Sequence, residues 1–208
     1  MFINTNNYPR LMVTELANKI MGYHYTNSCA YQSMKTKGID GRISFYSDDF
    51  TGLIPRRRFI RYGRGNGLPD EAHDGIIEGL LEPEPKSWLE NSEFPYLWNN
   101  LMHDICRDKE VMLLSFELTP KDKAYVVDRA HVERELYRES KDKETSTEKT
   151  MNKAVKKYWK SRVPVFEYDG SYTTPQLAIW SGIEFARLKI EWKKPTNEVW
   201  QRVLDNNW

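Results

Sequence analysis

A histidine close to the N-terminus has neighbours that suit it for binding an anion or a nucleotide. It is His24, in the segment Gly22-Tyr-His-Tyr-Thr-Asn27, which reads as a short strand followed by a helix that ends at Gly38. A helix start offers unpaired N–H donors and the positive end of the helix dipole, and the imidazole adds a donor or an acceptor. His24 is therefore either a ligand-binding group or a hydrogen-bonded histidine beside the core.

Five arginines lie within residues 56–64 and form a second candidate site. The planar guanidinium group donates two parallel hydrogen bonds to a phosphate, and the interleaved Phe59 and Tyr62 could stack on a base. The glycine spacing is not that of a Walker loop, because the Lys-Ser/Thr end is missing. The alternative is a solvated basic loop that pairs with acidic neighbours such as Asp70 and Glu71.

A carboxylate, Glu167, ends the apolar stretch 163–166, where an ion is costly unless it has a task. If this strand end faces a cleft, Glu167 could bond a ribose hydroxyl and stabilise a cationic sugar in the transition state. Alternatively, it faces solvent on an edge strand. Asp128, at another strand end, is better placed as the N-cap of a helix.

Metal ions and thiol chemistry are not expected. The histidines His73 and His103 lie on predicted helices without ligand-spaced partners, and Cys29 and Cys106 form no zinc-type spacing. The two cysteines are expected to be free thiols of a cytoplasmic protein.

The composition indicates one folded domain. The chain has 208 residues, and its 7 Trp, 12 Tyr and 8 Phe argue against disorder. A net charge of +1 gives no overall attraction to nucleic acid or membrane, so any basic surface must be local. The sequence shows neither a signal peptide nor an apolar run long enough to span a membrane, so no membrane partner is expected.

Hydrophobic periodicity and turn residues predict an α+β fold, because strands and helices mix without regular alternation. Helices are expected at residues 8–21, 28–37, 70–81, 96–106 and 195–206, a helix or turn at 175–180, and strands at 23–26, 42–46, 111–118, 124–128, 163–168 and 185–192. Strands 111–118 and 124–128 are expected to pair across a turn. Residues 69–106 would form a helical insertion, and residues 140–149 a mobile connector.

Together these features resemble the ADP-ribosyltransferase superfamily, on the side of its DarT-like branch. The segment around His24, with Ile39 after Gly38, looks like the first motif: an aromatic residue, His, any residue, Thr, and a helix ending in Gly-(Leu/Ile). Segments 111–118 and 125–128 look like the central strands. Glu167, followed by Pro175 and Ile183, is similar to the last motif. The resemblance implies a single domain, 1–208, with a central split β-sheet flanked by helices.

The resemblance also implies that NAD is the substrate and that no metal takes part. His24 would hydrogen-bond the nicotinamide ribose and Glu167 would be the catalytic acid. The other NAD-binding candidates are the rest of the first motif, an arginine for the pyrophosphate and a tyrosine that stacks on nicotinamide: Tyr25, Thr26, Asn27, Arg56, Arg57, Arg58, Tyr46 and Tyr62.

The implied activity is transfer of ADP-ribose to a nucleic-acid or protein acceptor, in a toxin, defence or phage–host setting. The Ser-Thr-Ser and Glu-x-Glu signatures of arginine-modifying members are absent, which argues against arginine as the acceptor. The alternative is a non-catalytic binding or inhibitor protein that uses the arginine cluster. The two hypotheses differ in geometry, because only catalysis requires His24 and Glu167 to line one cleft.

Overall fold

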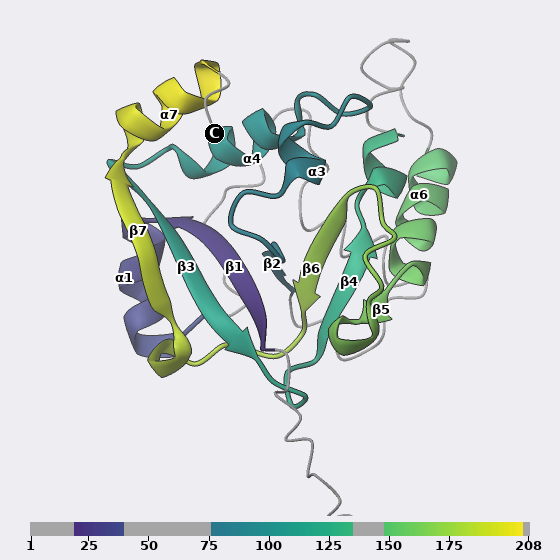
Figure 1. The fold of residues 1–208 in the computed structure, drawn as a ribbon, viewed down its shortest axis with the longest axis horizontal. Helices are drawn as coiled ribbons and strands as arrows, with labels where there is room; N and C mark the ends of the chain where they lie inside the picture. The colour runs from purple at the N-terminus through teal and green to yellow at the C-terminus, as the bar shows by residue number, and fades with distance from the viewer. Residues whose placement is uncertain (1–18, 40–75, 135–147, 206–208) are drawn as a thin grey trace, which may run out of the picture.

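Two antiparallel sheets stand side by side at the centre of the molecule, with helices around them (Figure 1). The computed structural model describes residues 19–39, 76–134 and 148–205. The fold is therefore mixed α+β, as the sequence predicts. No helix in these three ranges is long and apolar enough to cross a membrane.

The order of the elements mixes strands and helices throughout the chain. The strands are β1 (Ile20–Asn27), β2 (Ile77–Gly79), β3 (Glu110–Leu118), β4 (Ala124–Asp128), β5 (Val163–Pro164), β6 (Pro175–Ile179) and β7 (Lys189–Pro195). The helices are α1 (Ser28–Lys37), α3 (Lys86–Leu89), α4 (Leu97–Ile105), α6 (Glu148–Lys160) and α7 (Thr196–Leu204), with 3₁₀ turns η2 (Val165–Glu167) and η3 (Phe185–Arg187).

The first sheet has the order β1-β3-β7. All of β1 pairs with β3, from Ile20 opposite Leu118 to Asn27 opposite Val111. On its other side, β3 pairs with β7 through a register shift between Leu113 and Leu114. The second sheet has the order β2-β6-β4-β5.

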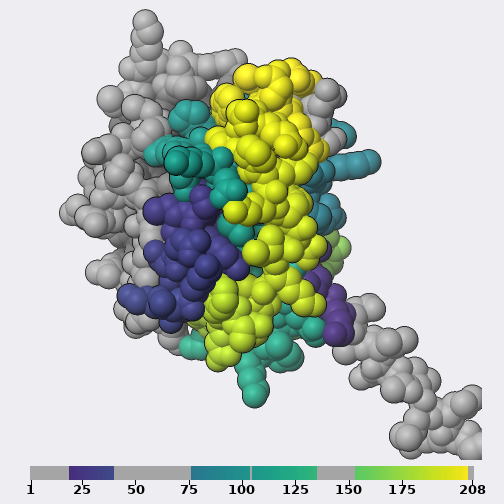
Figure 2. Space-filling model, turned by 90° about the vertical axis from the view of Figure 1, so that its left-hand side faces the viewer, coloured from purple at the N-terminus to yellow at the C-terminus, as the bar shows by residue number. Residues whose placement is uncertain are grey.

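The core divides between the sheet faces, because successive strand residues point to opposite sides. On one face of both sheets, residues such as Leu114 and Leu177 pack in one cluster with Met34 of α1. On the other face of the first sheet, Leu113 packs in a second cluster with residues of α4 and α7. Tyr158 and Trp159 of α6 form a third cluster with Val127 and Ala178 on the second sheet. Figure 2 shows one side of the molecule, where α1, β7 and α7 form the surface.

Several predicted elements are confirmed. Helix α1 covers residues 28–37 as expected and ends at Gly38, whose φ is 69°. Only glycine fits there, since an added Cβ would lie 2.1 Å from the carbonyl oxygen of Ile183. Strands β3 and β4 and helices α4 and α7 also lie where the sequence predicts them. Cys29 and Cys106 are free thiols.

Other predictions are wrong because long-range pairing decides the structure. Residues 20–21 and 77–79 were expected in helices, but they belong to β1 and β2, which pair with β3 and β6. Strands β3 and β4 do not pair with each other. Thr119 donates to Asp122 in the intervening turn, and the chain then passes from the first sheet to the second.

The C-terminal third contains three further corrections. Strand β5 ends at Pro164, which lacks an N–H for the ladder, and Glu167 therefore lies in η2 and not at a strand end. Residues 175–179 form strand β6, not a helix or turn, because the short run is buried between β2 and β4. Residues 185–187 form the turn η3 and not the start of the last strand, which covers Lys189–Pro195 as β7.

Candidate functional site at the seam between the sheets

The two sheets meet at one pair of residues, Tyr23 of β1 and Leu80 just after β2, which exchange two backbone hydrogen bonds of 2.9 Å. In a continuous antiparallel ladder the next hydrogen-bonded pair would join Tyr25 and Glu78. Instead, Nδ1 of His24 lies 2.9 Å from the carbonyl oxygen of Glu78. The imidazole thus takes the place of a ladder bond where the sheets part. We call this place, formed by Tyr23, His24, Glu78 and Leu80, the seam.

The bond to Glu78 fixes both the orientation and the proton of His24. A carbonyl oxygen only accepts, so Nδ1 must carry the proton, and in the neutral ring Nε2 is an acceptor. The side chain is half-buried. A half-buried imidazole of fixed orientation is suited to binding a hydroxyl group of a ligand.

The other residues of the first motif do not all lie on the same side as His24. Tyr25 points to the opposite face, packs edge-on against Trp98 and donates its hydroxyl to the carbonyl of Pro83 at 2.8 Å. Burial raises the pKa of the Tyr25 phenol above its usual value. Asn27 caps α1 by accepting from the N–H of Ala30 at 2.9 Å. Tyr25 and Asn27 therefore have structural bonds where ligand contacts were expected.

Thr26 lies on the same face of β1 as His24, because the two residues are separated by one position. Its side chain is buried, with 1% exposed. Of the predicted NAD-binding residues in the described part of the chain, His24 therefore has the most accessible side chain.

A charged pair is buried on the second sheet, close to the seam. Arg129 donates from Nε to Oε1 of Glu133 at 2.6 Å, with 18% of the arginine side chain and none of the glutamate side chain exposed. Burial opposes the charge on Arg129, but the nearby carboxylates of Glu133 and Glu78 outweigh it and raise the pKa of the guanidinium group. Oε2 of Glu133 is buried and has no hydrogen-bond partner in the structure described.

Register places Glu78 and Gln176 on the same face of the second sheet. Glu78 is opposite Ala178, and Gln176 precedes Ala178 by two residues. The Oε1 atom of Gln176 accepts a hydrogen bond of 2.9 Å from the hydroxyl of Tyr158 in α6. The backbone N–H of Arg129 bonds the carbonyl of Thr174, just before β6.

These five residues form what we call the charge cluster: Glu78, Arg129, Glu133, Tyr158 and Gln176. Its formal charge is −1, from one arginine and two glutamates. Only the backbone of Glu78 contacts His24, because the side chain of His24 lies on the sheet face of Leu114 and that of Glu78 on the opposite face. The cluster combines hydrogen-bond donors and acceptors with a negative charge, which suits a polar ligand that carries positive charge.

The structure does not bring Glu167 to His24. Glu167 is exposed in η2, directly after β5. The strand order from His24 runs β1, β2, β6, β4, β5, so four strand spacings separate the two, or about 19 Å at the usual spacing. In Figure 1, strands β2, β6 and β4 lie between β1 and β5.

The remaining sequence candidates are placed as follows. Tyr46, Arg56, Arg57, Arg58 and Tyr62 lie outside the described residues, as does His73. His103 is exposed on α4, where its ring contacts Trp200 edge-on. Asp128 accepts from the N–H of Ala130, as expected of a helix N-cap. Within the described ranges, no group of three or more His, Cys, Asp or Glu residues could hold a metal ion.

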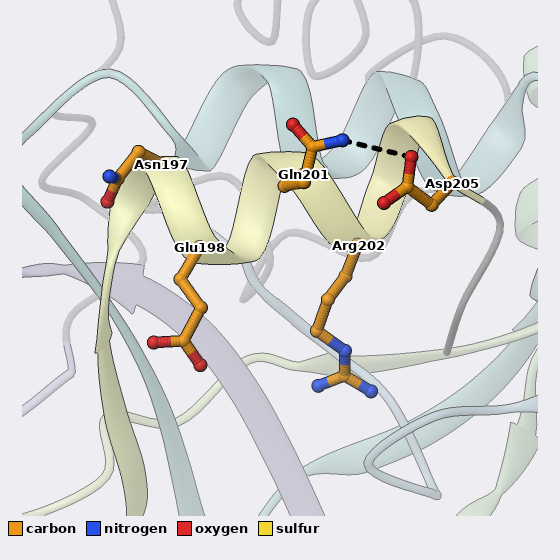
Figure 3. Close-up of a pocket in the computed structure, with 5 residues that line it drawn as sticks. All are labelled: Asn197, Glu198, Gln201, Arg202 and Asp205. Carbon is orange, nitrogen blue, oxygen red and sulfur yellow. Dashed lines mark hydrogen bonds between the residues drawn. The ribbon is translucent and has the colours of Figure 1, made fainter.

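A second polar region lies on α7 (Figure 3). A shallow hollow of about 480 Å³ is lined, among the described residues, by α7 and its C-cap: Asn197, Glu198, Gln201, Arg202 and Asp205. Gln201 donates to Asp205 at 2.9 Å, and Arg202 lies 3.7 Å from Glu84. The hollow shares no residue with the charge cluster.

The sequence analysis missed the charge cluster. One signal was present: Arg129 and Glu133 are four residues apart, with the apolar Ala130 and Val132 between them. Gln176 was a second signal, since it precedes the apolar residues 177–179. Glu78 could not be recognised from the sequence, because residues 70–81 were predicted to form a helix, whereas Glu78 lies in strand β2.

Comparison with known proteins gave no match: no family model, no curated protein and no solved structure matches the chain.

Proposed function

We propose that this protein is an NAD-dependent ADP-ribosyltransferase whose acceptor is a nucleic acid or a protein. The observation that carries the proposal is the seam, where His24 stands between two sheets with its Nδ1 proton held by the carbonyl oxygen of Glu78. The two sheets, joined by one bridging pair, agree with the split β-sheet that the resemblance implies.

The charge of NAD indicates what its binding site must supply. The nicotinamide ring of NAD is positively charged, and the ribose gains positive charge as the bond to nicotinamide breaks. A carboxylate beside the sugar would favour both charges, and groups that the fold holds in place need little reorganisation during the reaction. His24 would bind the nicotinamide ribose on the sheet face that it shares with Leu114, whereas the charge cluster lies on the opposite face.

In this reaction a nucleophilic oxygen or nitrogen of the acceptor attacks C1′ of the ribose. The C1′–N bond breaks, its electron pair stays on the nicotinamide nitrogen, and the acceptor loses a proton. The side chains of Glu78 and Glu133 lie on the sheet face opposite to His24, so we keep Glu167, to which the resemblance gives this role, as the candidate carboxylate. A setting in toxin action, defence or phage–host conflict is part of the proposal and rests on the resemblance alone.

The test is to incubate the protein with NAD labelled in the adenine ring and with a cell extract, and to measure released nicotinamide and labelled macromolecules. His24→Ala and Glu167→Gln should each lower nicotinamide release at least tenfold, while Glu82→Gln, an exposed glutamate near the seam, should not. Glu78→Gln decides between the carboxylates, because a loss equal to that of His24→Ala would move the electrostatic role to the charge cluster. Absence of both release and labelling in the wild type would end the enzymatic proposal.

The separation of His24 and Glu167 favours a second candidate, a non-catalytic binding or inhibitor protein that acts through the arginine cluster. This function needs no shared cleft. Replacing Arg56, Arg57 and Arg58 together by Ala should then weaken binding to nucleic acid and reduce the salt dependence of that binding by about three units of slope. An unchanged slope would remove phosphate contact from this candidate.

A further inference from the structure

One side of helix α6 is strongly basic. The helix lies beside β4, on the side of the molecule away from β1 (Figure 1). Residues 149–162 contain no Asp or Glu. Four exposed lysines occupy positions i, i+3, i+4 and i+7 of the helix, a spacing that places them on one side: Lys153, Lys156, Lys157 and Lys160. We call these four residues the lysine face.

The core fixes the direction in which the lysine face points. The other residues within 153–160 are buried and pack in the third apolar cluster, against the second sheet: Ala154, Val155, Tyr158 and Trp159. In this part of α6 every exposed residue is therefore a lysine. Because the opposite side is held in the core, the four lysines face solvent as one group.

No ion pair neutralises the lysine face. In the described ranges, none of its ammonium groups lies within 4.0 Å of a carboxylate oxygen. Lysines elsewhere do have such partners, since Lys19 pairs with Glu117 at 3.0 Å and Lys193 with Glu110 at 2.7 Å. Like charges three and four residues apart repel each other on a helix. A polyanion that binds to the face would relieve this repulsion.

Neither the overall charge nor the helix dipole accounts for the lysine face. The chain as a whole is nearly neutral, with 31 Lys and Arg against 30 Asp and Glu, so this concentration of charge is local. Lys157 and Lys160 lie in the last turn, where cations favour the helix dipole. Lys153 and Lys156 precede that turn, so the dipole does not explain them.

We propose that the lysine face binds the phosphate backbone of a nucleic acid. A lysine ammonium group binds phosphate as a compact point charge. Residues 153–160 rise about 10 Å along the helix axis. Over about 10 Å a nucleic-acid duplex carries about six negative charges, at about 1.7 Å of axis per charge. An extended acidic peptide carries about three over the same length, so the duplex matches the four lysines better.

A membrane surface fits the lysine face less well. A helix that lies on a membrane inserts an apolar side between the lipids. In α6 the apolar side is packed against the second sheet and is not available for insertion. A nucleic acid needs only the charges, because phosphate contacts are independent of base sequence.

The experiment measures binding of a labelled DNA duplex of mixed sequence by fluorescence anisotropy, over a series of salt concentrations and without NAD. Replacement of all four residues of the lysine face by Gln should weaken binding at low salt at least tenfold. It should also reduce the slope of log K against log salt by about three units, because each phosphate contact contributes about 0.9. Replacement of the same residues by Arg keeps the charge and should preserve the affinity.

The matched control removes the same charge from four exposed lysines on other elements, which are replaced together by Gln: Lys35, Lys37, Lys121 and Lys123. This variant should keep the slope of the wild type. Melting temperatures within a few degrees of the wild type would show that the variants fold. If the control loses as much affinity as the α6 variant, binding follows net charge and the proposal is wrong.

Two further outcomes would overturn the proposal. One is a slope that does not change in the α6 variant but falls when Arg56, Arg57 and Arg58 are replaced by Ala, which would assign the phosphate contact to the arginine cluster. The other is binding of vesicles that contain phosphatidylserine without binding of the duplex, which would indicate a membrane surface.

The lysine face and the enzymatic function can fail separately. If the protein is an ADP-ribosyltransferase, the lysine face would hold a nucleic-acid acceptor, and this step alone rests on the proposed function. Duplex binding that depends on the four lysines, in a protein that releases no nicotinamide from NAD, would support the lysine face and contradict the enzymatic function. Release of nicotinamide without duplex binding would do the reverse.

Discussion

The charge cluster and the hollow on α7 are made of the same kinds of side chain, arginine, glutamate and an amide. In the charge cluster Glu133 has no exposed side-chain surface. On α7 the side chain of Glu198 is 54% exposed and pairs with Lys194 at 3.5 Å. Similar chemistry is therefore present twice, once shielded from water and once in contact with it.

The difference shows which of the two regions can bind a ligand through charge. Water screens the charges of α7, and an exposed ion pair contributes at most about 1 kcal/mol. In the charge cluster the same charges act at a lower effective dielectric, so a missing partner has a large cost and a fitting ligand a large gain. The predictions below test this contrast, from the largest expected effect to the smallest.

Replacing Glu133 by Ala should have the largest effect. Arg129 would lose its partner in a buried place, and removal of one member of a buried pair costs about 3–5 kcal/mol. Urea unfolding of the purified variant measures the loss in free energy of unfolding. A loss below about 1 kcal/mol would mean that the pair is solvated like the residues of α7.

A carboxylate of intermediate exposure, Asp122, should depend on pH. Its side chain is 5% exposed and pairs with Arg187, which is 28% exposed, at 2.6 Å. Burial alone would raise the pKa of Asp122, but the hydrogen bonds from Arg187 and Thr119 outweigh it and hold the pKa below the usual 3.8. Because the folded-state pKa is lowered, the stabilisation is present above the unfolded-state pKa and is lost as the pH falls through the folded-state value.

Asp122→Asn should therefore cost about 1–3 kcal/mol at neutral pH. The difference from the wild type should shrink as the pH falls below about 4. Melting curves of both proteins between neutral pH and pH 3 make the comparison. A difference that stays constant over this range would contradict the role of the ionised carboxylate.

Tyr158→Phe should have a smaller effect, about 1 kcal/mol, because it removes the hydroxyl group that holds Gln176 and keeps the ring in the core. Urea unfolding of the variant and the wild type measures this difference. An unchanged free energy of unfolding would mean that the hydrogen bond from Tyr158 to Gln176 does not stabilise the fold.

Glu198→Ala should have the smallest effect, within about 0.5 kcal/mol of the wild type. It is the matched control for Glu133→Ala, since both substitutions remove a glutamate that lies four residues after a cation in the sequence. An equally large loss from both variants would show that burial is not what distinguishes the two regions.

The elements that were predicted correctly are those that local residues decide. Asn27 and Gly38 determine both ends of α1, and the run of apolar residues 111–118 gives β3. Strand β6 was not predicted, because a short run after Pro175 becomes a strand only through its neighbours β2 and β4. The pairing of β3 with β1 and β7 is also a long-range property.

The candidate site shows the same division. His24 and the strand and helix around it were predicted from local residues, and they lie at the seam. Glu78, Arg129 and Gln176 come from three separate parts of the chain, and only the fold brings them together. The position of Glu167 could not be predicted because it depends on where β5 joins the second sheet.

The seam also has a mechanical consequence. Across it, β1 and β2 share two backbone bonds and the bond from His24, whereas β1 and β3 are paired along the whole length of β1. The molecule therefore consists of two sheets that share few backbone hydrogen bonds at the seam. The apolar cluster that both sheets share with α1 holds them together. When the two sheets separate locally, the backbone hydrogen bonds of Tyr23 and Leu80 should open before those of β3. The amides of Tyr23 and Leu80 should therefore show faster hydrogen–deuterium exchange than the amides of β3.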